Sequence, residues 1–255
     1  MPRGNRYRLA GHVWHLTERC HRGHFLLKFA RDRRAWTTWL CEARKRFGLA
    51  VLNYQVTSNH VHLLVLDRGG DEIACSMQLI AGCVGRAYNR RKRRAGAFWA
   101  DCYHATAVDT DEHPARCFTY IDLNMVRAGV VDHPRYWLDA GYHEIQQPPA
   151  RYRIIDREAL CGLLGTSEGT LATLQHEWIE AAFGTDVIVF SVFPKSIFAP
   201  SSLFGFETAP HPASPAQECT WHTLALSAII NYSCGKGADA CRSARMAIGK
   251  CRSRK

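Results

Sequence analysis

The sequence predicts an α+β fold in which helices cover an antiparallel sheet. Residues 49–57 and 60–66 are two apolar segments rich in strand formers, and the turn pair at 58–59 separates them, which predicts a hairpin. Helical patterns at 32–47 and 71–94 flank this hairpin on either side. The chain has 255 residues, which is enough for one sizeable core or two smaller domains.

Two elements are expected before the hairpin. Residues 12–17 alternate, with Val13, His15 and Thr17 against Trp14 and Leu16, and this alternation predicts a first strand. Asp32 is the expected cap of a helix that runs to about Phe47 and stops at Gly48.

Three elements are expected after the hairpin. A helix opens at Asp71 and ends in the basic run 86–94, and a short strand follows at 103–108. The acidic cluster 109–112 then precedes a helix at 115–128. This order, β-α-β-β-α-β and then a helix, is the split βαβ or ferredoxin-like arrangement, in which the second hairpin strand is central. The sequence does not fix whether the last helix lies over that strand.

The expected organisation has three parts. Residues 1–130 form the ferredoxin-like domain with the added helix, and residues 131–184 form a small helical subdomain with patterns near 156–165 and 170–183. Residues 185–255 lack amphipathic periodicity and hold five prolines and a basic end, so we expect poor order there and assign no function.

The composition indicates which kind of partner the protein binds and in which cellular compartment we expect it. The net charge of +10 favours a polyanionic partner, most simply nucleic acid, although solubility alone would account for part of it. We find neither a stretch of eighteen apolar residues nor a hydrophobic leader, so we expect a cytoplasmic protein with no membrane partner. The eleven cysteines never form Cys-x-x-Cys, which suits free thiols in a reducing compartment.

Two short stretches carry candidate chemistry. His60 and His62 lie two residues apart on a predicted strand, so both imidazoles point to one face and supply half of a divalent-metal site. The alternative is that they are polar residues on a wet strand face. On the helix 115–128, Tyr120, Asn124 and Arg127 fall on one side at i, i+4 and i+7.

Two basic segments are candidate DNA contacts. Arg3, Arg6 and Arg8 form an N-terminal arm that could follow phosphates or could simply be a frayed terminus. The second segment is a helix end, followed by three aromatic residues suited to stacking on unpaired bases. The alternative interpretation is that this basic segment is only a solvated helix face. It comprises Arg86, Arg90, Arg91, Lys92, Arg93 and Arg94, followed by Phe98, Trp99 and Tyr103.

These motifs together resemble those of the IS200-like tyrosine transposases, and most of all the bacterial REP-associated tyrosine transposases of the HUH endonuclease superfamily. The resemblance covers about residues 1–180. It rests on His60-Val61-His62 after Thr57-Ser58-Asn59, on the helix motif Tyr-Ile-Asp-Leu-Asn-Met-Val-Arg-Ala-Gly at 120–129, and on the basic opening at 1–3 with a strand soon after. Met125 departs from the family, which usually has proline there, and we expect this side chain to face the core.

The resemblance implies a mechanism and a substrate. His60, His62 and Asn124 would hold Mg²⁺ or Mn²⁺, and Tyr120 would be the nucleophile that forms a 5′-phosphotyrosine and leaves a free 3′-OH. The substrate would be single-stranded DNA beside an imperfect, REP-like hairpin in the bacterial nucleoid, cut by a monomer or homodimer. The run 86–94 and the C-terminal subdomain would grip the hairpin, and the N-terminal arm would read its flank. Arg127 would hold phosphate or pair with an acid.

Two other functions remain open on the sequence. One is a hairpin-DNA-binding protein that keeps this scaffold but does not cut, which the atypical C-terminus and Met125 would suit. The other is a zinc hydrolase in which His60 and His62 bind zinc with a third His, Asp or Glu and Tyr120 has no role.

Overall fold

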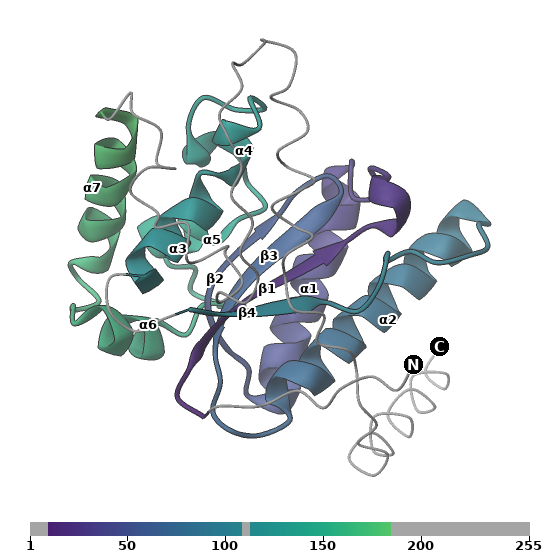
Figure 1. Cartoon of the computed structure of the whole chain (residues 1–255), viewed down its shortest axis with the longest axis horizontal. Coiled ribbons are helices and arrows are strands. Elements are labelled where there is room, and N and C mark those ends of the chain that lie inside the picture. Colours follow the sequence, from purple (N-terminus) through teal and green to yellow (C-terminus); the bar gives the residue numbers. More distant parts are fainter. Residues whose placement is uncertain (1–9, 109–112, 185–255) are drawn as a thin grey trace, which may run out of the picture.

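A four-stranded antiparallel sheet forms the centre of the molecule, with helices on both faces (Figure 1). The computed structural model describes residues 10–108 and 113–184. The strands lie in the order β2-β3-β1-β4, and each neighbouring pair is antiparallel. They are β1 (Val13–Arg19), β2 (Ala50–Val56), β3 (His60–Leu66) and β4 (His104–Val108).

The predicted ferredoxin-like topology is confirmed. Helix α1 (Ala30–Phe47) connects β1 to β2, and α2 (Glu72–Lys92) connects β3 to β4, which gives the order β-α-β-β-α-β with β3 inside the sheet. Three of the expected features lie outside the described residues: the arm with Arg3, Arg6 and Arg8, the cluster 109–112 and the tail 185–255.

The two faces of the sheet differ in chemistry. On one face Val61, Leu63 and Val65 of β3 are fully buried, and α1 and α2 pack side by side there (Figure 1). On the other face β3 presents His60 and His62, and α3 (His113–Asp122) lies across β2, β3 and β4. The helix after the fourth strand therefore covers the histidine face, which the sequence left undecided.

A bulge in β2 sets which of its side chains reach the histidine face. Val51 pairs with Val65, but Asn53 pairs with Leu64, so Leu52 is an extra residue in the ladder. Beyond the bulge, Asn53 and Gln55 share the face of His62. Both amides are completely buried, so each needs hydrogen-bond partners from the elements packed on it.

Helix α1 begins earlier than predicted. Its N-cap is Phe29, so the expectation that Asp32 caps the helix is wrong. Asp32 lies in the first turn, where a carboxylate also suits the helix dipole, and its Oδ1 accepts a 2.5 Å hydrogen bond from Arg91 Nη2. This buried pair joins the start of α1 to the end of α2. At the other end, Gly48 closes α1 at a φ of 70°, a conformation that glycine adopts without strain.

The single helix predicted at 115–128 is two helices. Helix α3 ends at Asp122, and a short α4 (Asn124–Arg127) follows after Leu123. Leu123 and Met125 are both buried, so the break keeps their side chains in the core, and the expectation that Met125 faces the core is confirmed.

Residues beyond α4 pack against the same sheet. Ile155 bridges Val51 in parallel, Ala140 bridges Gln55, and Leu160 belongs to the main apolar core. The other elements are η1 (His21–Gly23), η2 (Pro134–Tyr136), α5 (Gly141–Gln146), α6 (Arg157–Leu164) and α7 (Leu171–Gly184).

Two further findings concern the described residues. None of their helices combines the length and apolarity needed to span a bilayer. All their cysteines are free thiols, as the scattered spacing predicts.

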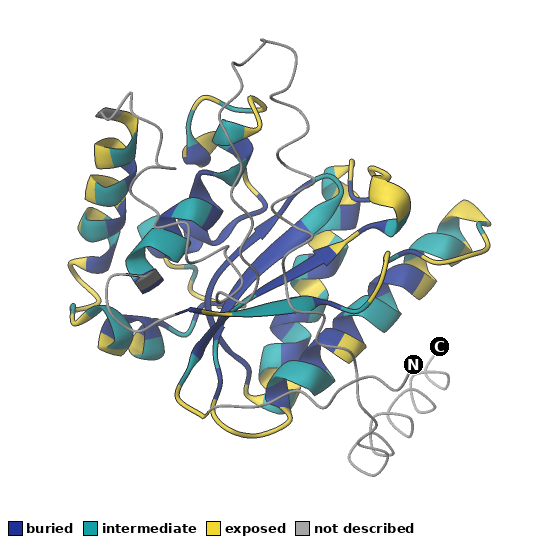
Figure 2. Cartoon of the chain, viewed as in Figure 1, coloured by how far each residue is buried: buried dark blue, intermediate teal, exposed yellow. Residues whose placement is uncertain are grey.

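Burial is greatest along the strands, whereas the loop after β1 and the connections at the ends of the sheet are exposed (Figure 2).

Candidate active site

The two histidines of β3 face each other. Nε2 of His60 lies 3.0 Å from Nε2 of His62, and the rings are nearly perpendicular, at 82°. His62 is 5% exposed, and burial, reinforced by the neighbouring His60 and His15, holds the pKa of His62 well below its usual range. His62 is therefore neutral near pH 7 and keeps a lone pair for a ligand.

Hydrogen bonds orient both imidazoles. His60 Nδ1 lies 2.7 Å from Asn59 Oδ1 and 2.9 Å from Thr57 Oγ1. Since a carbonyl oxygen only accepts, we assign a proton to Nδ1 of His60, and in that tautomer Nε2 carries the lone pair. On the other ring, His62 Nδ1 lies 3.0 Å from Nε2 of His15, which stacks on it at 5.2 Å. Outer partners of this kind commonly fix metal-binding histidines.

A third candidate ligand comes from the start of α4. Asn124 Nδ2 lies 3.1 Å from His62 Nε2, and rotation of the amide would bring Oδ1 to that position. Adjacent ligands of an octahedral Mg²⁺ ion at about 2.1 Å lie about 3.0 Å apart, which matches the separation of the two Nε2 atoms. Two imidazoles and an amide oxygen thus fit a hexacoordinate divalent ion with positions left for water and phosphate.

Among the residues that the structure describes, the zinc alternative lacks its third ligand. Across residues 10–108 and 113–184, no three His, Cys, Asp or Glu side chains form a cluster suited to a metal ion. His15 is close, but it approaches His62 through Nδ1, on the opposite edge of the ring from His60.

Tyr120 lies beside the histidine pair, at the C-terminal part of α3. Its ring centroid is 5.8 Å from that of His62 and 6.1 Å from that of His15, edge-on to both. Burial raises the pKa of the Tyr120 phenol, whereas the cations of Arg127 and Arg19 and a hydrogen bond with Asn124 lower it. The Arg127 guanidinium lies 5.0 Å from the centre of the Tyr120 ring. The break between α3 and α4 therefore still leaves all three predicted helix residues together.

A buried polar network fixes α3 on the sheet. Asn53 Nδ2 donates to Asp122 Oδ1 at 3.0 Å, and Gln175 Nε2 of α7 donates to Asp122 Oδ2 at 2.7 Å. Burial raises the pKa of Asp122 to about 7, although both hydrogen bonds favour the charged form. Because Asp122 lies two residues after Tyr120, this network anchors the part of α3 that carries the phenol.

Two residues near the site were not singled out from the sequence. His15 supports His62, and Arg19, which pairs with His60 across the β1–β3 ladder, acts electrostatically on Tyr120. The alternation of β1 places both on one face. The missing information was the pairing of β1 with β3, which brings that face against the histidines.

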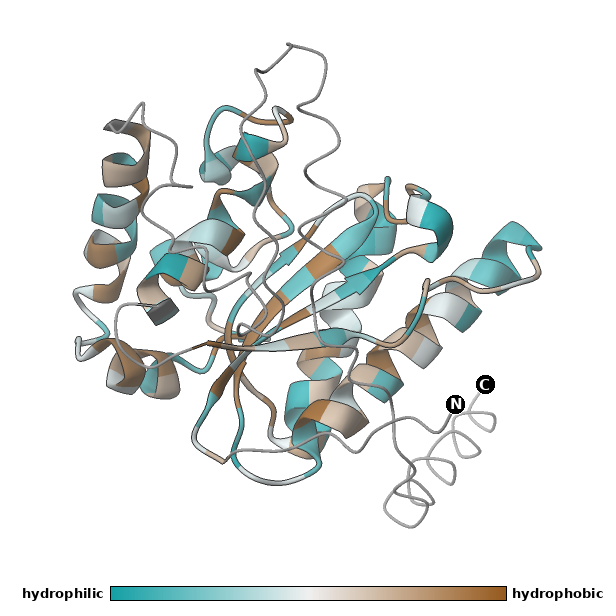
Figure 3. Ribbon diagram, in the orientation of Figure 1, coloured by the Kyte–Doolittle hydropathy of each residue, from teal (hydrophilic) through white to brown (hydrophobic). Residues whose placement is uncertain are grey.

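The basic run forms the outer end of α2, which is hydrophilic (Figure 3). Arg86, Arg90, Lys92 and Arg93 are exposed. Arg91 and Arg94 are half-buried and bonded internally, to Asp32 and to Asn89 and Ala97 respectively. The expectation that nearby aromatic rings stack on bases is wrong for Phe98 and Tyr103, which are core residues, and the Trp99 indole is partly buried and donates to Ala81 O.

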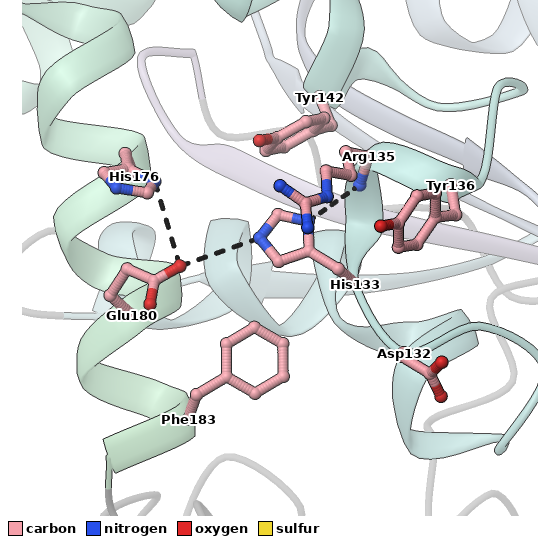
Figure 4. Close-up of a pocket in the computed structure, with 8 residues that line it drawn as sticks. All are labelled: Asp132, His133, Arg135, Tyr136, Tyr142, His176, Glu180 and Phe183. Carbon is pink, nitrogen blue, oxygen red and sulfur yellow. Dashed lines mark hydrogen bonds and ion pairs between the residues drawn. The ribbon is translucent and has the colours of Figure 1, made fainter.

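A separate shallow cavity of about 440 Å³ lies between the η2 region and α7 (Figure 4). Glu180 sits between two histidines there, 3.7 Å from His133 Nε2 and 3.9 Å from His176 Nδ1. Phe183 stacks on His133 at 5.6 Å. None of the predicted metal ligands or nucleophile lines this cavity, so the candidate site is on the sheet face instead.

One family of known proteins matches the part of the chain that contains this site. Residues 12–124 match the family described as Transposase IS200 like. The chain is thus similar to the IS200-like transposases over residues 12–124. The matched segment contains β1, the β2–β3 hairpin, α3 and Asn124, and therefore both halves of the candidate site.

Two solved structures are also similar to this chain. One is a REP-associated tyrosine transposase bound to a REP hairpin, with 16% identity over 61% of this chain and 94% of that chain and a TM-score of 0.48. The other is a proposed transposase from Deinococcus radiodurans R1, with 20% identity over 48% and 95% of the two chains and a TM-score of 0.34. No curated protein matches the chain.

Proposed function

We propose that this transposase domain is a divalent-metal-dependent single-strand DNA endonuclease and strand transferase that acts beside REP-like hairpins through a 5′-phosphotyrosine. The observation that carries the proposal is the convergence of Tyr120 and Asn124 on the His60–His62 pair. These groups come from elements about sixty residues apart. If His60 and His62 were only polar residues on a solvated strand face, nothing would require a phenol and an amide from later helices to lie beside them.

Each residue has a defined task in the reaction. His60, His62 and Asn124 would hold Mg²⁺ or Mn²⁺, which polarises the phosphoryl group and stabilises the leaving oxygen when bound. Tyr120 Oη attacks phosphorus, so a phosphotyrosine bond forms and the bond from phosphorus to the 3′ oxygen breaks. The phenol gives up one proton, and the 3′ oxygen takes one up as a hydroxyl. Arg127 and Arg19 favour the phenolate.

The reverse reaction joins a new strand. The phosphotyrosine conserves the phosphodiester, so attack on it by another 3′-OH restores a DNA linkage and frees the phenol without ATP. The exposed cations at the end of α2 and residues 131–184 would hold the hairpin while the ends exchange.

The proposal is tested by trapping the covalent intermediate. The full chain is incubated with Mn²⁺ and hairpin oligonucleotides carrying a library of flanking sequences, and the products are separated on a denaturing protein gel. We expect a DNA–protein adduct that is lost with Tyr120→Phe and kept with Tyr152→Phe, an exposed tyrosine near the opposite end of β2. An adduct that survives Tyr120→Phe would refute the nucleophile. Hairpin binding with no metal-dependent cleavage of any library member would favour a non-cutting DNA-binding protein instead.

A further inference from the structure

The loop that follows β1 carries two exposed aromatic side chains beside the candidate active site. Phe25 is 66% exposed and Phe29 is 59% exposed, and they are four residues apart. We propose that this loop, residues 21–29, is a platform on which unpaired bases next to the cleaved phosphodiester stack. The inference rests on the single-strand DNA function proposed above and assigns its base-binding surface.

Hydrogen bonds join the loop directly to the turn that positions His60. Leu27 N donates to Ser58 O at 2.9 Å, and Asn59 Nδ2 donates to Gly23 O at 3.3 Å. The same Asn59 side chain accepts through Oδ1 from His60 Nδ1 at 2.7 Å. A single amide therefore contacts both the aromatic loop and a metal-binding imidazole, which places the loop at the site.

Hydrogen bonds and a buried side chain hold the backbone of the loop that carries the two rings. Leu27 is completely buried, and Arg33 Nη1 donates to the backbone oxygens of Leu27 and Lys28 at 3.2 and 2.6 Å. Arg33 in turn is bonded to Asp139. Phe25 and Phe29 are thus exposed on a backbone that these hydrogen bonds hold. Exposed aromatic rings beside basic residues are the stacking surface that single-strand binders use.

The charge around the rings suits a polyanion. Residues 20–31 contain no acidic side chain, and Arg22 and Lys28 are exposed within them. The ammonium of Lys92, from the basic end of α2, lies 5.6 Å from the centre of the Phe29 ring. The platform therefore continues into the basic run, so phosphates can contact the cations while bases contact the rings. Phe98 and Tyr103, the rings expected to stack, are in the core and leave this task to the loop.

Binding is measured on the full chain with Tyr120→Phe and without metal, so that no covalent step contributes. The probe is an oligothymidylate of about 15 nucleotides with one 2-aminopurine, compared with a duplex of the same length. We expect Phe25→Leu and Phe29→Leu each to weaken single-strand binding about tenfold and to reduce 2-aminopurine quenching, because a stacked base contributes about 1–3 kcal/mol. Phe→Tyr at either position should retain binding, and duplex affinity should not change.

An exposed ring far from the site serves as the control for stacking. Tyr152→Asn removes such a ring, near the far end of the sheet, and should leave single-strand binding unchanged. The proposal is overturned if both Leu variants bind the oligothymidylate as tightly as the parent, if they weaken duplex binding equally, or if the parent does not bind it. Absence of the Mn²⁺-dependent adduct in the otherwise unchanged chain would instead refute the catalytic proposal, because the binding assay needs neither metal nor Tyr120.

Discussion

Asn53→Leu is expected to separate the role of the buried network from that of the catalytic groups. Asn53 is completely buried and touches no catalytic residue through its hydrogen bonds. Leucine fills a similar volume, but it removes the 3.0 Å bond to Asp122 and the acceptor that takes the Tyr54 N–H at 2.8 Å. A hydrogen bond to a charged group contributes about 1.5–3 kcal/mol, and a buried N–H left unpaired costs about 1–3 kcal/mol. We therefore expect the free energy of unfolding to fall by about 3–5 kcal/mol.

The assay is urea unfolding at about pH 8, above the Asp122 pKa of about 7 in the parent, where the carboxylate is mostly charged. Loss of the Asn53 hydrogen bond, which lowers this pKa, raises the pKa of Asp122 in the variant. Asn89→Leu is the matched control, because Asn89 also makes side-chain hydrogen bonds, to Gly96 and Arg94, but at a partly exposed position, where we expect a loss under about 1 kcal/mol. An Asn53→Leu protein that unfolds within about 0.5 kcal/mol of the parent would show that the network does not hold α3. If it does hold α3, adduct formation should fall even where the variant remains folded.

Three further outcomes are expected. Gly141→Ala should lower the free energy of unfolding by about 1–3 kcal/mol, because the added Cβ would collide with Asn53 Oδ1. Gly162→Ala, which has open space around it in α6, should raise the free energy of unfolding by about 0.5–1 kcal/mol. Chemical unfolding of both variants measures these changes. Glu18 is buried with no partner for Oε2 within the described structure, and burial raises its pKa well above the ordinary value. The folded state therefore keeps a proton that the unfolded state has lost, so the free energy of unfolding declines as pH rises from about 4.5 towards the folded pKa. Glu18→Gln should remove that decline and add at least about 1 kcal/mol to the free energy of unfolding at about pH 8. An unchanged slope of unfolding free energy against pH would contradict this. Asn124→Ala should weaken Mn²⁺ binding at least about tenfold by calorimetry while Asn124→Asp retains it, and equal affinities in the two variants would remove Asn124 from the ligand set.

Local patterns in the sequence were sufficient for most of the fold. Alternation predicted the strands, helical spacing predicted α1 and α2, and the order of elements predicted the sheet topology, because each depends on residues close together in the chain. The break at Leu123 was not predictable in the same way. Residues 120–128 keep a helical apolar pattern across it, so the local pattern does not distinguish one helix from two, and the burial of both Leu123 and Met125 is seen only in the folded chain.

In the candidate site too, the features set by local spacing were predictable from the sequence, and those that depend on distant contacts were not. Spacing alone placed His60 and His62 on one face, and it placed Tyr120 with Asn124 on one helix side. What joined these pairs at the sequence level was the resemblance to a family, since no local pattern states that α3 crosses β3. The supporting role of His15 depends on the ladder between β1 and β3, which brings the His15 side chain to that of His62, 47 positions along the chain. The exposure of Phe25 and Phe29 was likewise not predicted, because no local pattern indicates how the loop backbone, which Arg33 contacts, is placed.

The extra residue in β2 makes this one position of the strand tolerant of deletion. Val51 pairs with Val65 and Asn53 pairs with Leu64, so removal of Leu52 would make these two pairs consecutive and leave a ladder without a bulge. Asn53 and Gln55 would keep their partners on β3 and their side of the sheet, because side chains alternate strictly along a regular strand. Loss of one codon here would thus straighten β2 without moving the amides that receive α3, whereas loss of a residue inside the regular ladder of β3 would turn the side chains beyond it to the other face.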